Sequence, residues 1–204
     1  MLEFYKEHWY LALVLLGMVI GALLLSRKAM LASAKRNRER DAVLAELKEK
    51  NEAAKLFHTL DAAGAAAMDS KTLFAAAALH TQSLLENKAD PNTAFCALPI
   101  AVQQVYALHY LFEDAATSLS HFFKENGKPL TPAAHEAVHA LLGEALAESF
   151  DPMYAAYDPD NETASLLPEM LAQWNAAFAA AFVPDDLYPR IAAHIRENFA
   201  DFSE

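Results

Sequence analysis

Five residues in the C-terminal half of the chain have the types and the spacing of a zinc-hydrolase motif. Residues 135–139 read His-Glu-Ala-Val-His, which fits the pattern HExxH. Because residues four apart lie on one face of an α-helix, His135 and His139 can bind one Zn²⁺ while Glu136 acts as general base on a metal-bound water. A membrane-bound zinc metallopeptidase is therefore one of the functions that the sequence predicts.

A catalytic zinc site needs a third protein ligand, which the motif itself does not supply. No further histidine follows at the spacing of the extended metzincin motif. The downstream carboxylates of Glu162 and Glu169 are the candidate donors. A site of this kind depends on the tertiary structure to bring one of them to the histidines.

The same five residues also fit an ordinary packing helix. On a helical wheel His135 and His139 fall at one edge of an apolar stripe, and Glu136 points toward solvent. The stripe consists of Val138, Leu141, Leu142, Ala145 and Leu146. In this second interpretation the histidines bind no metal, and the protein needs no cofactor.

Charge is distributed unevenly along the chain. Residues 52–204 contain 7 Lys and Arg against 21 Asp and Glu, a net charge of −14, whereas residues 1–50 contain 9 against 6, a net charge of +3. A domain this acidic repels nucleic acid and attracts basic surfaces. We therefore expect no direct nucleic-acid binding, and we expect a protein partner with a basic surface. Solubility is the alternative reason for the charge.

An apolar stretch near the N-terminus has the length of a membrane span. Residues 9–26 carry no charged side chain, and an 18-residue helix covers roughly 27 Å, close to a hydrocarbon core of about 30 Å. We expect an uncleaved transmembrane helix here, after an extracytoplasmic tail of residues 1–8. The spacing of Gly17 and Gly21 permits close helix contact, and therefore a homodimer through this helix.

Basic residues concentrate on the C-terminal side of the predicted span. Lys6 is the only Lys or Arg before it, and cytoplasmic flanks are the more basic ones. The residues that follow the span and can lie on an anionic membrane surface are Arg27, Lys28, Lys35, Arg36, Arg38 and Arg40. The sequence thus predicts an extracytoplasmic N-terminus and a cytoplasmic C-terminal domain in the cell membrane.

The rest of the chain has the composition of an all-α protein, with 5 Gly and many Ala runs. We expect a basic-to-mixed juxtamembrane helix over residues 27–60 and a compact acidic helical domain over residues 61–204. Within that domain, capping and proline signals predict helices over residues 69–87, from 99 onward, over 131–149, near 166–178 and over 184–202, with loops at 88–92, 125–129 and 158–161. The single Cys96 is expected to pack in the core.

One stretch resembles a known family in the order and spacing of several residues. These are Leu98-Pro99, Val105-Tyr106, Glu113, Leu119, Phe122-Phe123, Gly127 and Leu142-Gly143. Over about residues 95–155 the chain thereby resembles the C-terminal domain family of DNA-mimic proteins, small acidic helical domains. Where that family has Asn-Gly-Gly, this chain has Ala116-Thr117-Ser118. The resemblance implies carboxylates that occupy the positions of DNA phosphates on a basic protein.

The sequence favours a membrane-anchored cytoplasmic helical domain that acts by protein–protein interaction through an acidic surface. The zinc metallopeptidase is the alternative.

Overall fold

The computed structural model describes residues 18, 44–45, 48, 52–157 and 167–202 of the chain. Residues 50–204 form one compact unit by their contacts, separate from residues 1–49. The predicted transmembrane helix, including Gly17 and Gly21, and the basic residues that follow it lie outside the described residues, apart from Met18. Among the residues that are described, no helix is long and apolar enough to cross a membrane.

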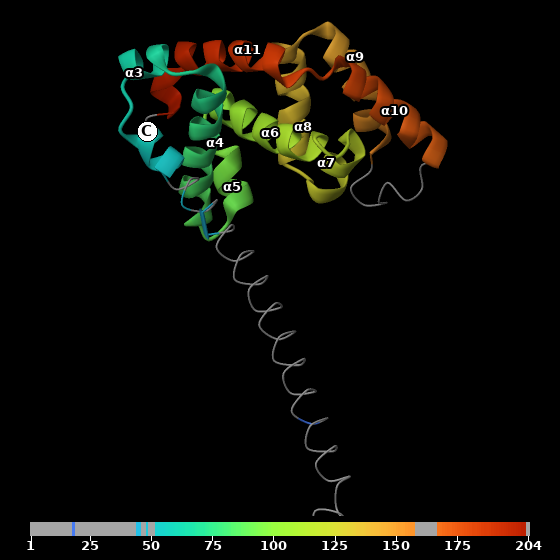
Figure 1. The fold of residues 1–204 in the computed structure, drawn as a ribbon, viewed down its shortest axis with the longest axis horizontal. Helices are drawn as coiled ribbons and strands as arrows, with labels where there is room; N and C mark the ends of the chain where they lie inside the picture. The colour runs from blue at the N-terminus through green and yellow to red at the C-terminus, as the bar shows by residue number, and fades with distance from the viewer. Residues whose placement is uncertain (1–17, 19–43, 46–47, 49–51, 158–166, 203–204) are drawn as a thin grey trace, which may run out of the picture. The chain divides into compact units, whose positions relative to one another are not determined.

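All regular structure in the described part of the chain is helical, as predicted (Figure 1). Residues 52–58 are helical and precede the elements of the domain. These elements are α3 (Ala62–Ala67), α4 (Ser70–Glu86), α5 (Pro91–Cys96), α6 (Ile100–Ala115), α7 (Leu119–Glu125), α8 (Leu130–Ala137), the π-helix η1 (Val138–Leu142), α9 (Glu144–Ala156), α10 (Pro168–Ala181), α11 (Pro184–Glu197) and the 3₁₀ helix η3 (Phe199–Phe202).

Several helices begin at side chains that accept hydrogen bonds from free backbone N–H groups. Asp69 accepts from Thr72 N at 3.0 Å and so caps α4, and Asp90 accepts from Thr93 N at 3.2 Å and so caps α5. The bond with Thr72 holds the pKa of Asp69 below its ordinary value, and hydrogen bonds from the side chain and then the backbone of Thr93 do the same for Asp90. Ser118 caps α7 in the same way, through His121 N at 3.1 Å.

The core lies between α4, α6, α8 and α11, with α9 and α10 packed on one another beside them. Alanines without exposed surface, such as Ala76 and Ala134, allow these helices to approach closely. Fully buried aromatic rings fill the space under α7 and α9; they are Phe122, Phe123, Phe150 and Phe178. Arg196 of α11 donates to the carbonyls of Ala65 and Met68 at 3.0 and 2.8 Å. These hydrogen bonds hold α3 against α11.

Capping residues and prolines in the sequence predicted most helix ends correctly. The helix predicted over 69–87 is α4, with Asp69 and Asn87 as its caps, and the helix predicted from residue 99 is α6. The predicted loop at 88–92 is shorter than expected, because Asp90 starts the short helix α5. The expectation that Cys96 packs in the core is wrong: Cys96 ends α5 and is exposed.

The single helix predicted over 131–149 does not exist, and this difference shapes the candidate site. The chain is helical to Leu142, turns at Gly143, and starts α9 at Glu144. Gly143 has φ 96° and ψ 164°, a conformation that is open almost only to glycine. Because of this turn, α9 packs against α8 and η1 instead of continuing them.

Candidate functional site

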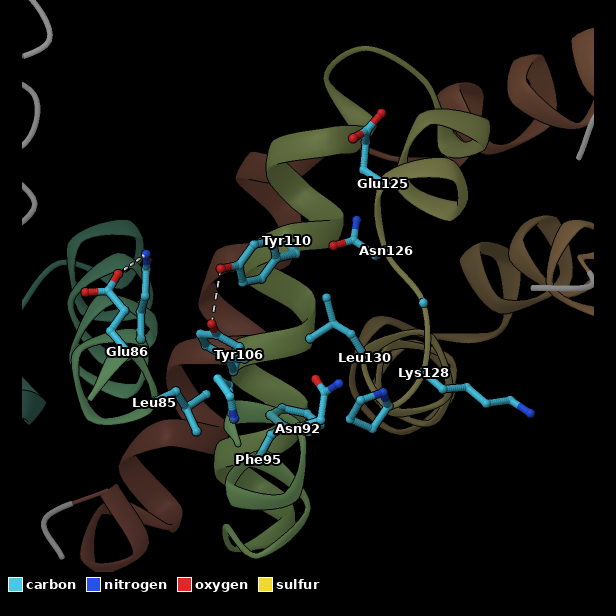
Figure 2. Close-up of a pocket in the computed structure, with 14 residues that line it drawn as sticks. Leu85, Glu86, Asn92, Phe95, Tyr106, Tyr110, Glu125, Asn126, Lys128 and Leu130 are labelled. Carbon is cyan, nitrogen blue, oxygen red and sulfur yellow. Dashed lines mark hydrogen bonds between the residues drawn. The ribbon is translucent and has the colours of Figure 1, made fainter. Parts of the chain in front are cut away.

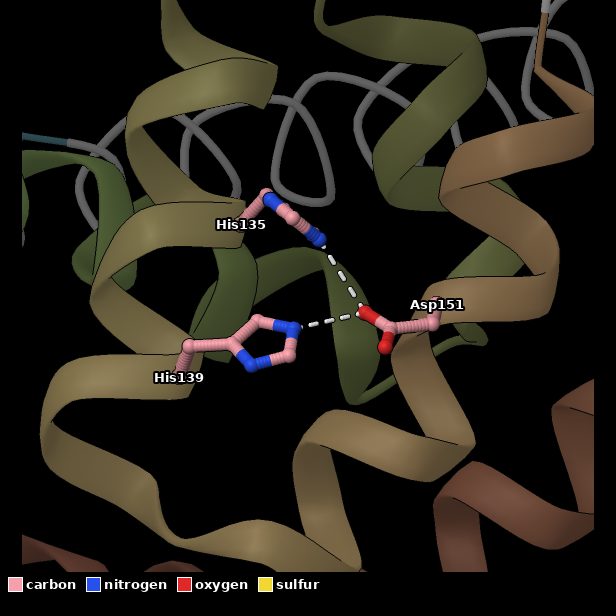
Figure 3. Close-up of side chains that lie close together, drawn as sticks. All are labelled: His135, His139 and Asp151. Atoms are coloured by element: carbon pink, nitrogen blue, oxygen red, sulfur yellow. Dashed lines mark hydrogen bonds and ion pairs between the residues drawn. The ribbon is translucent and has the colours of Figure 1, made fainter.

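A histidine–aspartate cluster, defined as His135, His139 and Asp151, lies where α8 and η1 face α9 (Figure 3). His135 is near the end of α8, and His139 is in η1, one helical turn later. Asp151 comes from α9, directly before Pro152, which has no backbone N–H to continue the helix ladder. Short π-helical turns of the kind that holds His139 occur often at functional sites.

The three side chains converge on one point. Nε2 of His135 lies 3.0 Å from Asp151 Oδ1, and Nε2 of His139 lies 2.8 Å from the same oxygen. Figure 3 shows both imidazole rings turned toward this carboxylate. The side chains are 29%, 45% and 44% exposed for His135, His139 and Asp151, so water reaches the cluster.

Aromatic side chains hold the His135 ring in place. Tyr154, one turn after Asp151 on α9, stacks on it with a centroid distance of 4.0 Å and an interplanar angle of 10°. Phe150, which has no exposed surface, lies under the same ring at 6.1 Å. The orientation of His135 is therefore set by packing as well as by its bond to Asp151.

The charge of Asp151 is stabilised by its two histidine partners. Partial burial raises the pKa of this carboxyl, but the hydrogen bonds and charge interactions with His139 and His135 outweigh burial. The net effect holds the pKa of Asp151 below its ordinary value. The carboxylate is thus ionised at neutral pH.

The other residues predicted for a zinc site are placed differently. Glu136 is exposed on α8 and does not belong to the group of converging donors. Glu169 is exposed in the first turn of α10 and is also outside this group. Glu162 lies outside the described residues. The carboxylate that the structure brings to the histidines is Asp151, which the sequence did not single out.

A second candidate site is an open pocket of about 350 Å³, here named the tyrosine pocket (Figure 2). Tyr106 and Tyr110 of α6 line one side, and Glu86 and Leu85 of α4 line another. The remaining lining residues come from α4, α5, the end of α7, the loop that follows it and the start of α8: Gln82, Pro91, Asn92, Phe95, Glu125, Asn126, Gly127, Lys128, Pro129 and Leu130. Figure 2 shows Lys128 extending away from the two tyrosines.

The two phenol groups of the pocket are bonded to each other. Tyr106 Oη and Tyr110 Oη are 3.1 Å apart, and the rings meet edge to face at 5.1 Å. Burial, and then the bond with Tyr110, raises the pKa of Tyr106 well above its ordinary value. Tyr106 therefore remains an uncharged phenol, and the carboxylates of Glu86 and Glu125 supply the negative charge of the pocket.

The loop that closes the pocket is anchored to α6. Asn126 donates through Nδ2 to Asp114 Oδ2 at 2.5 Å and to the carbonyl of Phe122 at 2.9 Å. The Lys128–Pro129 peptide bond in this loop is cis. The loop between α7 and α8 is thus held against the end of α6, next to Tyr110 (Figure 2).

Sequence reasoning missed Asp151 for one reason and the tyrosines for another. Asp151 lies beyond Gly143, and only the reversal of the chain there brings it back to His135 and His139. Tyr106 and Tyr110 carry a weak local signal, because residues four apart share one face of a helix. Nothing local indicates that α4 and α5 leave open space over that face.

Comparisons of this chain with protein-family models, with curated proteins and with solved structures found no match.

Proposed function

We propose that the chain is a membrane-anchored helical domain that binds another protein on the cytoplasmic side, and that the tyrosine pocket receives a basic side chain of this partner. The observation that carries the proposal is a pocket lined by aromatic side chains and two carboxylates in a domain of strongly negative charge. Aromatic rings attract cations through their faces, and a nearby carboxylate adds a charge-assisted hydrogen bond.

The residues around the pocket suit a Lys or Arg side chain better than an acidic or purely apolar one. Phe95 and Leu85 give an apolar surface for the methylene stem. Glu86 on one side of the two tyrosines, or Glu125 on the other, can pair with the charged head (Figure 2). Glu86 is held in position by Gln82, whose Nε2 donates to Glu86 Oε1 at 2.7 Å. The resemblance of residues 95–155 to DNA-mimic domains also implies a basic partner surface.

Site-specific photo-crosslinking in cells tests this function. A photoreactive residue in place of Asn92, which lines the pocket, should form an adduct with one protein, and Glu86→Lys or Glu125→Lys should remove the adduct. Glu148→Lys makes the same change of charge at an exposed position of α9 and should leave it intact. An adduct that survives both pocket substitutions, or that Glu148→Lys removes equally, contradicts the proposal.

The anchor is tested separately by deletion of residues 1–26. The shortened chain should leave the membrane fraction, and the adduct at residue 92 should decrease if the partner is also at the membrane. A shortened chain that stays in the membrane fraction contradicts the proposed transmembrane helix.

The zinc metallopeptidase is the second candidate, because the two histidines of HExxH have a third donor within reach in Asp151. It ranks below protein binding, since Glu136 is exposed and separate from the converging donors. A peptidase should lose hydrolysis of a peptide substrate on Glu136→Gln and keep its bound zinc. Zinc-loaded protein that hydrolyses no peptide, or that hydrolyses peptides equally well after Glu136→Gln, contradicts this candidate.

A further inference from the structure

We infer that the histidine–aspartate cluster binds one divalent transition-metal ion, with Zn²⁺ the best-suited ion, and that this ion joins α8 and η1 to α9. This site is independent of the tyrosine pocket and requires no hydrolysis. Its ligands are His135 Nε2, His139 Nε2 and Asp151 Oδ1. One position remains for water.

The distances fit this assignment. In a tetrahedral zinc site with ligand bonds of about 2.0–2.2 Å, neighbouring donor atoms lie about 3.4 Å apart. The two Nε2 atoms are 3.0 and 2.8 Å from Asp151 Oδ1, and all three donor atoms lie within 4.8 Å of one another. An ion at their centre needs the two nitrogen–oxygen distances to lengthen by about 0.4 and 0.6 Å, and the two nitrogens, which lie within 4.8 Å of one another, to settle at about 3.4 Å.

The donor set determines the class of ion. Two imidazole nitrogens and one carboxylate oxygen suit Zn²⁺ and its first-row neighbours, whereas Ca²⁺ and Mg²⁺ prefer oxygen ligands alone. Two neutral imidazoles and one carboxylate leave a bound divalent ion with one positive charge, which the acidic domain stabilises. The exposure of His139 and Asp151, 45% and 44%, leaves room for a water ligand.

The surroundings of the cluster restrict the motion of its ligands. Tyr154 stacks on His135 and fixes the plane of the ring, as second-layer residues do in metal sites. His139 sits in a π-helical turn that ends at Gly143, so both histidines precede the chain reversal and Asp151 follows it. A bound ion therefore joins the two arms of this reversal and opposes their separation.

Zinc titration of the metal-stripped full-length chain in detergent tests the site. Calorimetry should show one ion per chain, and Co²⁺ should give the intense visible absorption of a tetrahedral complex. His139→Gln and Asp151→Asn should each weaken binding at least about 100-fold, because loss of a supporting residue alone costs about 10–100-fold. Zinc should also raise the midpoint of thermal unfolding of the wild type and not of these variants.

Matched variants show whether the cluster itself holds the ion. His121→Gln removes another surface histidine that lies near two carboxylates, at 4.0 Å from Asp114 and 3.9 Å from Glu125, and should leave zinc binding unchanged. Glu136→Gln should also leave it unchanged, because Glu136 is not among the three converging donors. Tyr154→Phe keeps the stacked ring and should bind zinc normally, whereas Tyr154→Ala should bind about tenfold more weakly.

Two results overturn the inference. One is a folded wild-type chain that binds no zinc or cobalt up to millimolar concentrations. The other is binding of one ion per chain that persists in both His139→Gln and Asp151→Asn, which assigns the ion to other residues. Circular dichroism of each variant shows whether its helices remain formed, and Asp151→Asn, which keeps the shape of the side chain, is the variant expected to preserve the fold.

Discussion

The histidine–aspartate cluster and the tyrosine pocket are built in opposite ways. The cluster comes from one short stretch of chain, since His135 and Asp151 are 16 positions apart, and its side chains already touch. The pocket gathers residues from Gln82 to Leu130 on several helices, and its side chains enclose open space. The cluster therefore depends on one turn of the backbone, whereas the pocket depends on the packing of whole helices.

This contrast also separates the two proposed ligands. A metal ion needs donors that are fixed to within a few tenths of an ångström, and a short hairpin with a stacked tyrosine provides such precision. A partner side chain needs volume, an apolar wall and charge at the rim, which helices at some distance from one another provide. Substitutions that affect one region and spare the other test this division.

The largest expected effect is at the packing under the cluster. Phe150→Ala should lower the free energy of unfolding by about 3–5 kcal/mol, because Phe150 has no exposed surface and lies 5.2 Å from Phe123 by ring centroids. Phe95→Ala should cost less, since Phe95 lines the open tyrosine pocket and keeps 3% of its surface exposed. Chemical denaturation measures both, and equal losses contradict the contrast.

The second-largest effect is expected from substitution of one glycine in each region, Gly143 in the turn before α9 and Gly127 in the loop of the tyrosine pocket. Gly143→Ala should lower stability by about 1–3 kcal/mol, because φ 96° is strained for any side chain. A Cβ at this position also lies 2.9 Å from Nη1 of Arg190, which donates to the carbonyl of Leu142 at 3.2 Å. Gly127→Ala in the loop of the pocket should be almost neutral, since nothing lies within 4 Å of the added Cβ.

The same two glycines should differ in function as well as in stability. Gly143→Ala should weaken zinc binding at the cluster, because the arm that carries Asp151 moves relative to His135 and His139. Gly127→Ala should leave zinc binding unchanged. Zinc titration of the two folded variants checks this, and equal affinities contradict the role assigned to the turn at Gly143.

A smaller effect compares one carboxylate from each region. Asp114→Ala should cost about 1–2 kcal/mol, because the half-buried amide of Asn126 loses its charged acceptor at 2.5 Å and keeps only the carbonyl of Phe122. Asp151→Ala in metal-free protein should cost less than about 1 kcal/mol, since that side chain is 44% exposed and solvent screens its pairs. Thermal unfolding of metal-free protein gives both values. A larger loss at Asp151 makes the cluster a structural element even without an ion.

The smallest effect concerns the phenols of the pocket at alkaline pH. Burial raises the pKa of Tyr106, so above about pH 10 the unfolded state releases a proton that the folded state keeps, and stability falls as the pH rises. Tyr106→Phe should cost about 0.5–1.5 kcal/mol at neutral pH and should reduce this alkaline loss. Unfolding at pH 8 and pH 10.5 measures the difference, and an unchanged alkaline loss contradicts the burial of this phenol.

Much of the secondary structure was predictable, because helix ends depend on neighbours in the chain. Asp69 and Asn87 cap the two ends of α4 through contacts within a few residues. The charge of the domain follows from composition alone. The same holds for the pairing of His135 with His139 on one helical face. These features come from the sequence by itself, since they rest on interactions over at most one or two helical turns.

The third donor and the pocket were decided only by the tertiary structure. The sequence pattern predicted a helix that continues through Gly143, because a single glycine within a helical pattern is often tolerated. Its conformation reverses the chain and brings Asp151, rather than Glu169, to the histidines. The tyrosine pocket likewise exists because α4, α5, α6 and the loop before α8 leave a space over Tyr106 and Tyr110. Contacts between side chains of different helices depend on how whole helices pack, and local sequence patterns do not encode that packing.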